Sequence, residues 1–200
     1  MTVIEDLVRE LLLWLSIMSV NPPPMETVNE NLPRVYVVPQ EELSETIVGC
    51  PTQLLGLYIG GENHIVVISG IEGDDGDVLL VISPQHKSNL VHELQHYQQD
   101  LLGELTKEEI EEREREAYEI ENQWRTLNNL PPLDVEEMVE FSVEGIESEN
   151  VCLDGSTPNA PDDMDELREK LHSTVFKYEQ NRKLREIYES RDINTTHGQE

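Results

Sequence analysis

The chain has 200 residues, enough for one domain with a helical extension, and 37% of them are hydrophobic, which supports a modest core. Its formal net charge of −28 argues against nucleic acids and anionic membranes as partners, because both surfaces would repel it. Two cysteines, Cys50 and Cys152, are too few for a disulfide framework and indicate a reducing compartment. The N-terminus also lacks the features of a signal peptide, so we expect a cytoplasmic protein.

The first eighty residues predict one helix followed by a small sheet. Apolar residues recur at helical spacing over residues 2–19, and the prolines at 22–24 end this helix and begin an extended linker. The β-branched and apolar runs that follow are bounded by Gly, Pro and Asn, as strands commonly are. They predict strands at 34–38, 54–60, 64–69 and 77–83, a hairpin turn at 60–63 and a short helix from 40 to 44.

Residues 92–96 read His-Glu-Leu-Gln-His, an HExxH pattern. On a helix, two histidines four residues apart lie one turn above each other on the same face, where both imidazoles can reach one Zn2+. Glu93 stands beside the first histidine, in position to act as the general base on a water molecule. We expect this helix over residues 88–102, with Ser88 as its N-cap and Gly103 as its stop.

The second half of the chain predicts further helices. One is expected from about 106 to 129 and another over 135–145, with Asp134 as its cap. A loop at 147–162 leads to a long amphipathic helix at 163–191 and a disordered tail. We therefore divide the chain into a metal-binding domain, residues 1–146, and an acidic, helical extension, residues 147–200.

A catalytic zinc site needs a third protein ligand, and the helix after the motif offers two glutamates. Glu114 and Glu116 flank its apolar stripe on opposite edges at similar angles, so periodicity alone does not choose between them. The small side chain of Ala117 would let this helix approach the motif helix closely.

HExxH followed by a Glu-rich helix reading E-x-E-A-Y resembles the gluzincin metallopeptidases. In several of those families the second helix reads E-x-x-A-D, and its first Glu is the third zinc ligand. The resemblance makes Glu114 the ligand and places Tyr118 where those families have an Asp that orients a zinc-bound histidine. Other gluzincins place Ala directly after the ligand, which would select Glu116.

The layout of residues 11–130 is similar to that of small uncharacterised HExxH proteins called minigluzincins. The shared features are the Trp14-Leu15 pair, the Pro-rich linker, a small sheet, and the sequences HELxHxxQ and EREAY. The resemblance implies an α+β, zincin-like core in which a small, mostly antiparallel sheet packs on the HExxH and Glu-bearing helices, with the long C-terminal helix added. It also implies that an edge strand, 54–60 or 64–69, binds extended peptide.

These features predict a zinc metallopeptidase that acts on a peptide or protein substrate, with Glu93 as general base and His92, His96 and Glu114 as ligands. Candidates for stabilising the oxyanion are Tyr97, Tyr118, His64 and His86. One alternative is a non-catalytic zinc site, closed by a fourth protein ligand such as His86 or another Glu. A second is an acidic protein-interaction module, for which the charge is the only support.

Overall fold

The computed structural model describes residues 3–44, 55–60, 64–72, 78–79, 83–103 and 110–148, and the single residue 169. The helix predicted at 135–145 runs on to Ser148, so the first two residues of the loop predicted at 147–162 are helical. The rest of that loop, most of the predicted C-terminal helix and the tail lie outside the described residues. The elements are α1 (Val3–Met18), α2 (Met25–Glu30), β1 (Arg34–Pro39), α3 (Gln40–Glu42), β2 (Gly56–Ile59), β3 (Ile65–Glu72), β4 (Val78–Leu79), α4 (Pro84–Leu101), α5 (Ile110–Leu127) and α6 (Val135–Ser148).

The described strands form a small mixed sheet with the order β1-β3-β2. β2 and β3 are antiparallel, with Gly56 opposite Ile68 and Ile59 opposite Ile65, as the predicted hairpin requires. β1 runs parallel to β3, and β4 pairs antiparallel with the end of β3. The predicted α+β class is confirmed, and the sheet is mixed because β1 joins it through a crossover.

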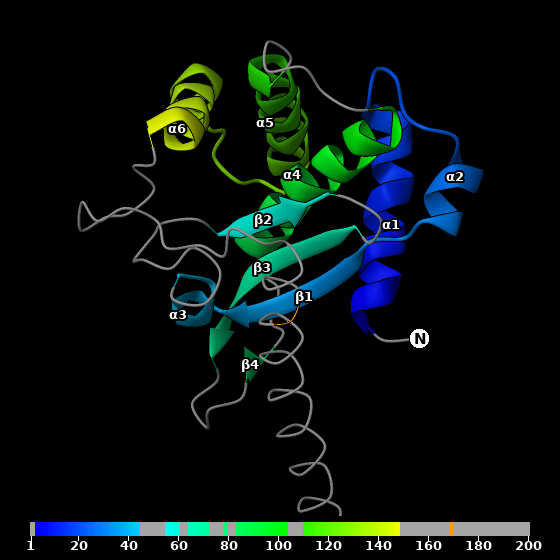
Figure 1. Ribbon diagram of the computed structural model, residues 1–200, viewed down its shortest axis with the longest axis horizontal. Coiled ribbons are helices and arrows are strands. Elements are labelled where there is room, and N and C mark those ends of the chain that lie inside the picture. Colours follow the sequence, from blue (N-terminus) through cyan, green and yellow to red (C-terminus); the bar gives the residue numbers. More distant parts are fainter. Residues whose placement is uncertain are drawn as a thin grey trace, which may run out of the picture.

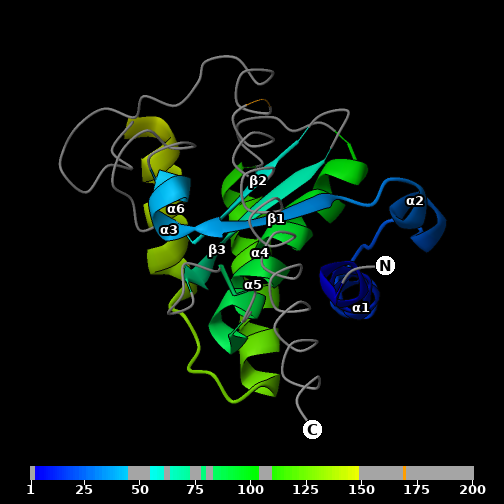
Figure 2. The ribbon, with the colours of Figure 1, turned by 90° about the horizontal axis from the view of Figure 1, so that it is seen from below.

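Helix α4 packs against the sheet, and α1 lies beside α4 (Figures 1 and 2). α5 packs along α4 on the side away from α1, and α6 packs on α5. α1, the sheet and α4 bury apolar side chains against one another, together with Ile120 and Trp124 of α5, as helices and sheets do when they bury their hydrophobic faces. The main core cluster comprises Val8, Leu11, Leu12, Leu15, Val28, Val66, Ile68, Leu90, Val91, Leu94, Tyr97, Ile120 and Trp124.

The motif helix begins four residues earlier than the sequence suggested. Its N-cap is Ser83, whose Oγ accepts a hydrogen bond of 3.3 Å from the backbone N–H of His86, and Pro84 opens the first turn. Proline suits this position because its fixed φ is helical and its missing N–H would have no partner there. The prediction that Ser88 is the cap is wrong: Ser88 lies within the helix and is fully buried. At the other end, Gly103 has φ +138°, as expected of a helix stop.

One further helix was not predicted, and one predicted helix start is confirmed. The linker after the prolines contains the short helix α2, which the sequence did not suggest, and its Val28 is fully buried in the core. At α6, the predicted cap is confirmed by a hydrogen bond of 3.3 Å from the N–H of Glu137 to Asp134 Oδ1.

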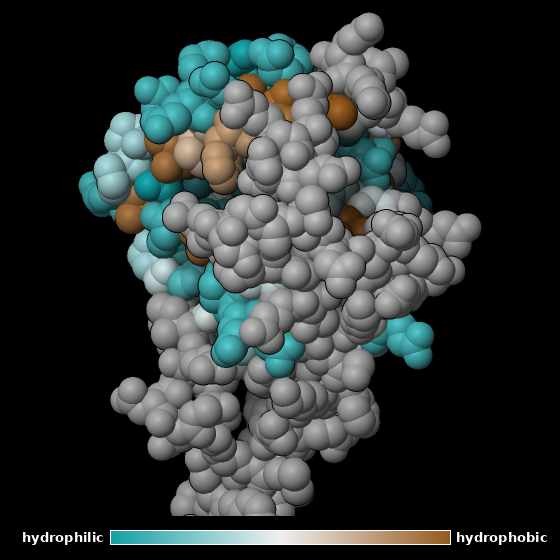
Figure 3. Space-filling view, turned by 60° about the vertical axis from the view of Figure 1, so that its left-hand side comes forward, coloured by the Kyte–Doolittle hydropathy of each residue, from teal (hydrophilic) through white to brown (hydrophobic). Residues whose placement is uncertain are grey.

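On the face shown in Figure 3, the visible described residues are mostly hydrophilic, with a group of apolar residues among them. This agrees with the large net charge, because acidic side chains gain little from burial and stay solvated. Among the described helices, none is both long and apolar enough to cross a membrane.

Candidate metal centre

The two motif histidines of α4 point their Nε2 atoms at the same spot. His92 Nε2 and His96 Nε2 lie 3.1 Å apart, and the ring centroids are 4.7 Å apart with the planes nearly perpendicular. This is the consequence of the four-residue spacing on a helix. Both side chains face α5.

Helix α5 supplies the carboxylate of Glu114. Its Oε1 lies 3.3 Å from His96 Nε2 and its Oε2 lies 3.6 Å from His92 Nε2. Each of these three residues offers one ligand atom, and the three atoms lie within 4.8 Å of one another. Two imidazole nitrogens and one carboxylate oxygen, converging in a largely buried position, form a group that could hold a metal ion.

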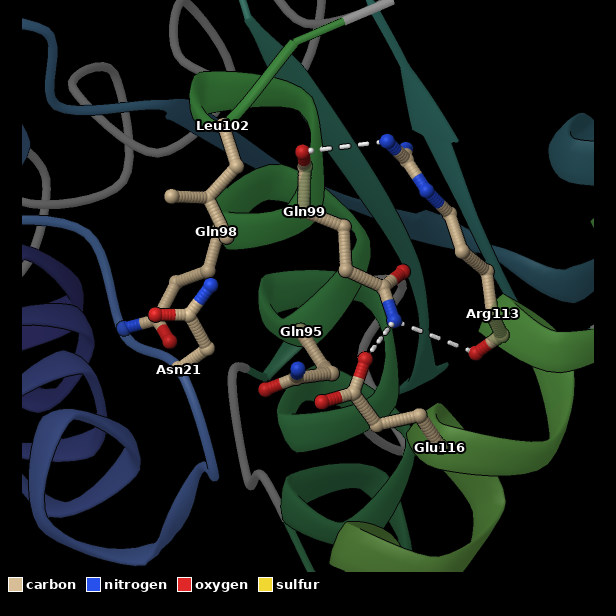
Figure 4. A pocket seen from close by; sticks show the side chains of 7 residues that line it. All are labelled: Asn21, Gln95, Gln98, Gln99, Leu102, Arg113 and Glu116. Atoms are coloured by element: carbon tan, nitrogen blue, oxygen red, sulfur yellow. Dashed lines mark hydrogen bonds between the residues drawn. The ribbon is translucent and has the colours of Figure 1, made fainter. Parts of the chain in front are cut away.

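Glu116, the alternative ligand, points away from this group. Its Oε2 accepts a hydrogen bond of 2.7 Å from Gln99 Nε2, and Gln99 Nε2 also donates to the backbone carbonyl of Arg113 (Figure 4). Gln99 Oε1 in turn lies 2.9 Å from His96 Nδ1. Glu116 therefore lies behind His96, one side chain away from it, and helps to fix the rotamer of that histidine through Gln99.

The corresponding contact of His92 is made by Glu121, a residue that the sequence analysis did not single out. Glu121 Oε2 lies 3.4 Å from His92 Nδ1, and only 2% of Glu121 is exposed to solvent. The resemblance placed Tyr118 in this orienting role. Tyr118 does touch His92, with ring centroids 4.2 Å apart, but its hydroxyl bonds to Ser142 Oγ at 2.8 Å. The carboxylate beside the histidine comes from one turn further along the helix, and the spacing Glu114–Glu121, two turns on one face, was the available signal.

Glu121 is itself held by a buried polar network between α4 and α5. Ser88 Oγ donates to Glu121 Oε1, and Arg125 Nη1 lies 3.4 Å from that oxygen and 3.2 Å from Ser88 Oγ. Arg125 Nε also donates to the carbonyl of Pro131 at 2.7 Å. Buried charges persist only when they are paired and hydrogen-bonded, and these groups satisfy one another. The network fixes the carboxylate that faces His92.

The carboxylates determine the charge of His92. Burial by itself lowers the pKa of His92, but Glu114 and Glu121 more than offset this and raise it to about 10. Burial likewise works against ionisation of Glu114, yet the two histidines lower its pKa well below the ordinary value. Without a metal, the pKa therefore favours an imidazolium at His92 paired with the Glu114 carboxylate at neutral pH. The proton on His92 Nε2 then occupies the position that a metal ion would need.

Glu93 lies on the sheet side of the same helix and is buried. Its pKa is raised, mainly because burial disfavours the charged form, while the neighbouring histidines act in the opposite direction. A carboxyl group whose pKa is moved toward neutrality is suited to take up and return protons.

The other side chains considered for the oxyanion are engaged elsewhere. Tyr97 donates to the carbonyls of Val28 and Asn31 within the core. His86 Nδ1 contacts the hydroxyl of the Ser83 cap at 2.7 Å. His64 belongs to a hydrogen-bonded cluster between the hairpin and the end of α4, in which the Tyr58 hydroxyl lies 2.6 Å from both His64 Nδ1 and Asp100 Oδ2. Of the four candidates, Tyr118 is therefore the one that touches a predicted ligand.

Comparisons with protein-family models, with curated proteins and with solved structures gave no match, so the resemblance to gluzincins rests on the motifs quoted above.

Proposed function

We propose that the protein is a zinc-dependent metallopeptidase. The observation that carries the proposal is the convergence of His92, His96 and Glu114. The two Nε2 atoms lie 3.1 Å apart, and each faces one oxygen of the Glu114 carboxylate, Oε1 at 3.3 Å from His96 and Oε2 at 3.6 Å from His92. Ligands of a tetrahedral zinc ion at about 2.0–2.1 Å lie about 3.3–3.4 Å from one another. The observed contacts are close to that spacing, and one ligand atom from each residue lies within 4.8 Å of the other two, so the three side chains could hold one zinc ion and leave a fourth position for water or substrate.

The chain's own groups have distinct tasks in this proposal. A bound zinc ion would supply Lewis acidity and bring the pKa of a water molecule toward about 7. Glu93 takes a proton from the attacking water and returns it to the departing amine of the cleaved peptide bond. Glu121 and Gln99 hold the two imidazoles in orientation through their Nδ1 atoms.

The sheet order supports β2 as the strand that would bind peptide. β3 is covered by β1 on one side and by β2 on the other, whereas β2 is paired on one side only among the described strands. An exposed strand edge can bind an extended peptide through main-chain hydrogen bonds. β2 also packs on α4, so a peptide along its edge would run past the motif helix.

The rival proposal of a closed, structural zinc site has less support. Structural sites usually have four protein ligands, whereas the metal-binding group found among the described residues has three. His86, a possible fourth ligand, contacts the hydroxyl of its own helix cap. An acidic interaction module would account for the charge but not for the converging donors.

Zinc binding by purified protein tests the proposal. We expect one zinc per chain, hydrolysis of an unstructured protein substrate such as casein, and loss of that activity on chelation with recovery on adding zinc. Glu114→Gln should weaken zinc binding strongly because it removes a charged ligand, while Glu119→Gln, at an exposed position of the same helix, should keep full stoichiometry. Glu116→Gln keeps an oxygen that can accept from Gln99 and should weaken binding far less than Glu114→Gln. Equal loss in Glu114→Gln and Glu116→Gln, or full zinc content in His96→Ala, would contradict the assigned ligands. Zinc at full stoichiometry without any hydrolysis would favour the non-catalytic alternative.

Zinc binding should also release a proton. The pKa of His92 in the metal-free protein is about 10, because Glu114 and Glu121 outweigh its burial, so at pH 7 its nitrogen must lose a proton to bind the metal. We expect release of about one proton per zinc, and a zinc affinity that rises about tenfold per pH unit between pH 7 and 9. Titration calorimetry in buffers of different ionisation enthalpy measures both. Zinc binding without proton release at pH 7 would show that His92 is neutral.

A further inference from the structure

Gly56 of β2 lies directly against the side chain of Glu93. A Cβ atom placed on residue 56 would stand 2.9 Å from Glu93 Oε1, 3.0 Å from its Cγ and 3.3 Å from its Cδ. The first of these distances is shorter than real Cβ atoms show, and the other two are tight. The carboxyl arm of Glu93 therefore fills the space that a side chain at position 56 would need.

The backbone gives no other reason for glycine at this position. Gly56 is a regular strand residue, paired with Ile68 of β3, and among the described glycines the left-handed conformation occurs at Gly103 and not at Gly56. Glycine weakens a strand relative to residues that carry a side chain, because it loses more conformational freedom and packs nothing. What glycine offers here is the absence of a Cβ atom.

We propose that Gly56 is a positioning residue for Glu93: its bare backbone forms the surface on which the carboxyl arm of the general base lies. The expected effect on catalysis rests on the proposed peptidase function, whereas the contact between Gly56 and Glu93 does not. The ligands His92, His96 and Glu114 come from α4 and α5, whereas Gly56 belongs to the sheet. A side chain at residue 56 would therefore displace the base without touching a ligand.

The steric part is tested by unfolding measurements on Gly56→Ala in three backgrounds. In the wild type, the urea midpoint should fall, because the added methyl group meets Glu93. In Glu93→Gln, which keeps the size of the side chain and removes the charge, it should fall by a similar amount. In Glu93→Ala, where the clash is gone, the same substitution should leave the midpoint unchanged or raise it, because alanine suits a strand better than glycine.

Gly60→Ala is the matched control, since its Cβ would meet Asp100 Oδ2 at 3.1 Å rather than any atom of Glu93. Its effect should be the same in all three backgrounds. If the effect of Gly56→Ala is also the same in all three, the proposal that Glu93 lies against Gly56 is overturned. If Gly56→Ala does not fold but the double variant Gly56→Ala, Glu93→Ala does, the proposed contact is supported. If neither variant folds, the proposed contact is overturned.

The functional part is read from kinetics of the zinc-loaded protein. Gly56→Ala should lower kcat about ten- to a hundredfold, the effect expected when a catalytic group is misplaced by a fraction of an ångström to about 1 Å, with KM and zinc content unchanged. A change in KM or zinc content with unchanged kcat would contradict the positioning role. Absence of hydrolysis in the wild type would refute the proposed function. The unfolding measurements would still decide whether Gly56 positions the side chain of Glu93.

Discussion

Replacing Glu93 by glutamine is expected to lower the rate of peptide hydrolysis by about a hundred- to ten-thousandfold, the contribution typical of general acid–base catalysis. Glutamine has the same size, so the fold and the three ligands should be retained, but an amide cannot accept the proton of the attacking water. The rate should be measured with the zinc-loaded protein at fixed substrate, alongside its zinc content.

The same substitution should make the fold more stable. Because burial raises the pKa of Glu93, the folded protein disfavours the charged carboxylate at neutral pH, and a neutral amide avoids that cost. Glu119→Gln, at an exposed position of α5, removes the same charge without this benefit and serves as control. Undiminished hydrolysis in Glu93→Gln would refute Glu93 as the base, whatever its effect on stability.

Removing Glu121 should have the largest effect on stability. Glu121→Ala leaves the guanidinium of Arg125, 4% exposed, and the imidazolium of His92 without the carboxylate that both contact. Breaking a buried ion pair by deleting one partner costs about 3–5 kcal/mol, which urea unfolding of the metal-free protein would measure. Zinc affinity should fall about 10- to 100-fold as well, because His92 loses the group that orients it.

A double variant separates the two roles of Glu121. Glu121→Leu combined with Arg125→Met replaces the pair with apolar side chains of similar size and should recover much of the stability. It should not recover zinc affinity, because Nδ1 of His92 still has no carboxylate beside it. Recovery of both properties would mean that Glu121 affects the metal centre only through the stability of the fold.

Local rules in the sequence were sufficient for most elements and for two of the ligands. Helical spacing indicated α1, α4 and α5, alternation and turn residues indicated the β2–β3 hairpin, and Asp134 marked the start of α6. HExxH fixed the relative placement of His92 and His96, because four residues on a helix make a single turn whatever surrounds it. The start of α4 was missed although its signal, Ser83 followed by Pro84, is local. The short helix α2 was missed because its sequence signal is weak, and it buries Val28 in the core.

The sequence by itself determined that two imidazoles share a helix face with a carboxylate beside them, since these relations depend only on helix geometry. Only the tertiary structure decided which glutamate of α5 joins them. The rotation of α5 about its own axis, relative to α4, decides whether Glu114 or Glu116 faces the histidines. It also decided that Glu121 rather than Tyr118 faces His92 Nδ1, and that Gly56 lies against Glu93. These contacts join residues of separate elements, and their distances are fixed by how those elements pack rather than by spacing along the chain.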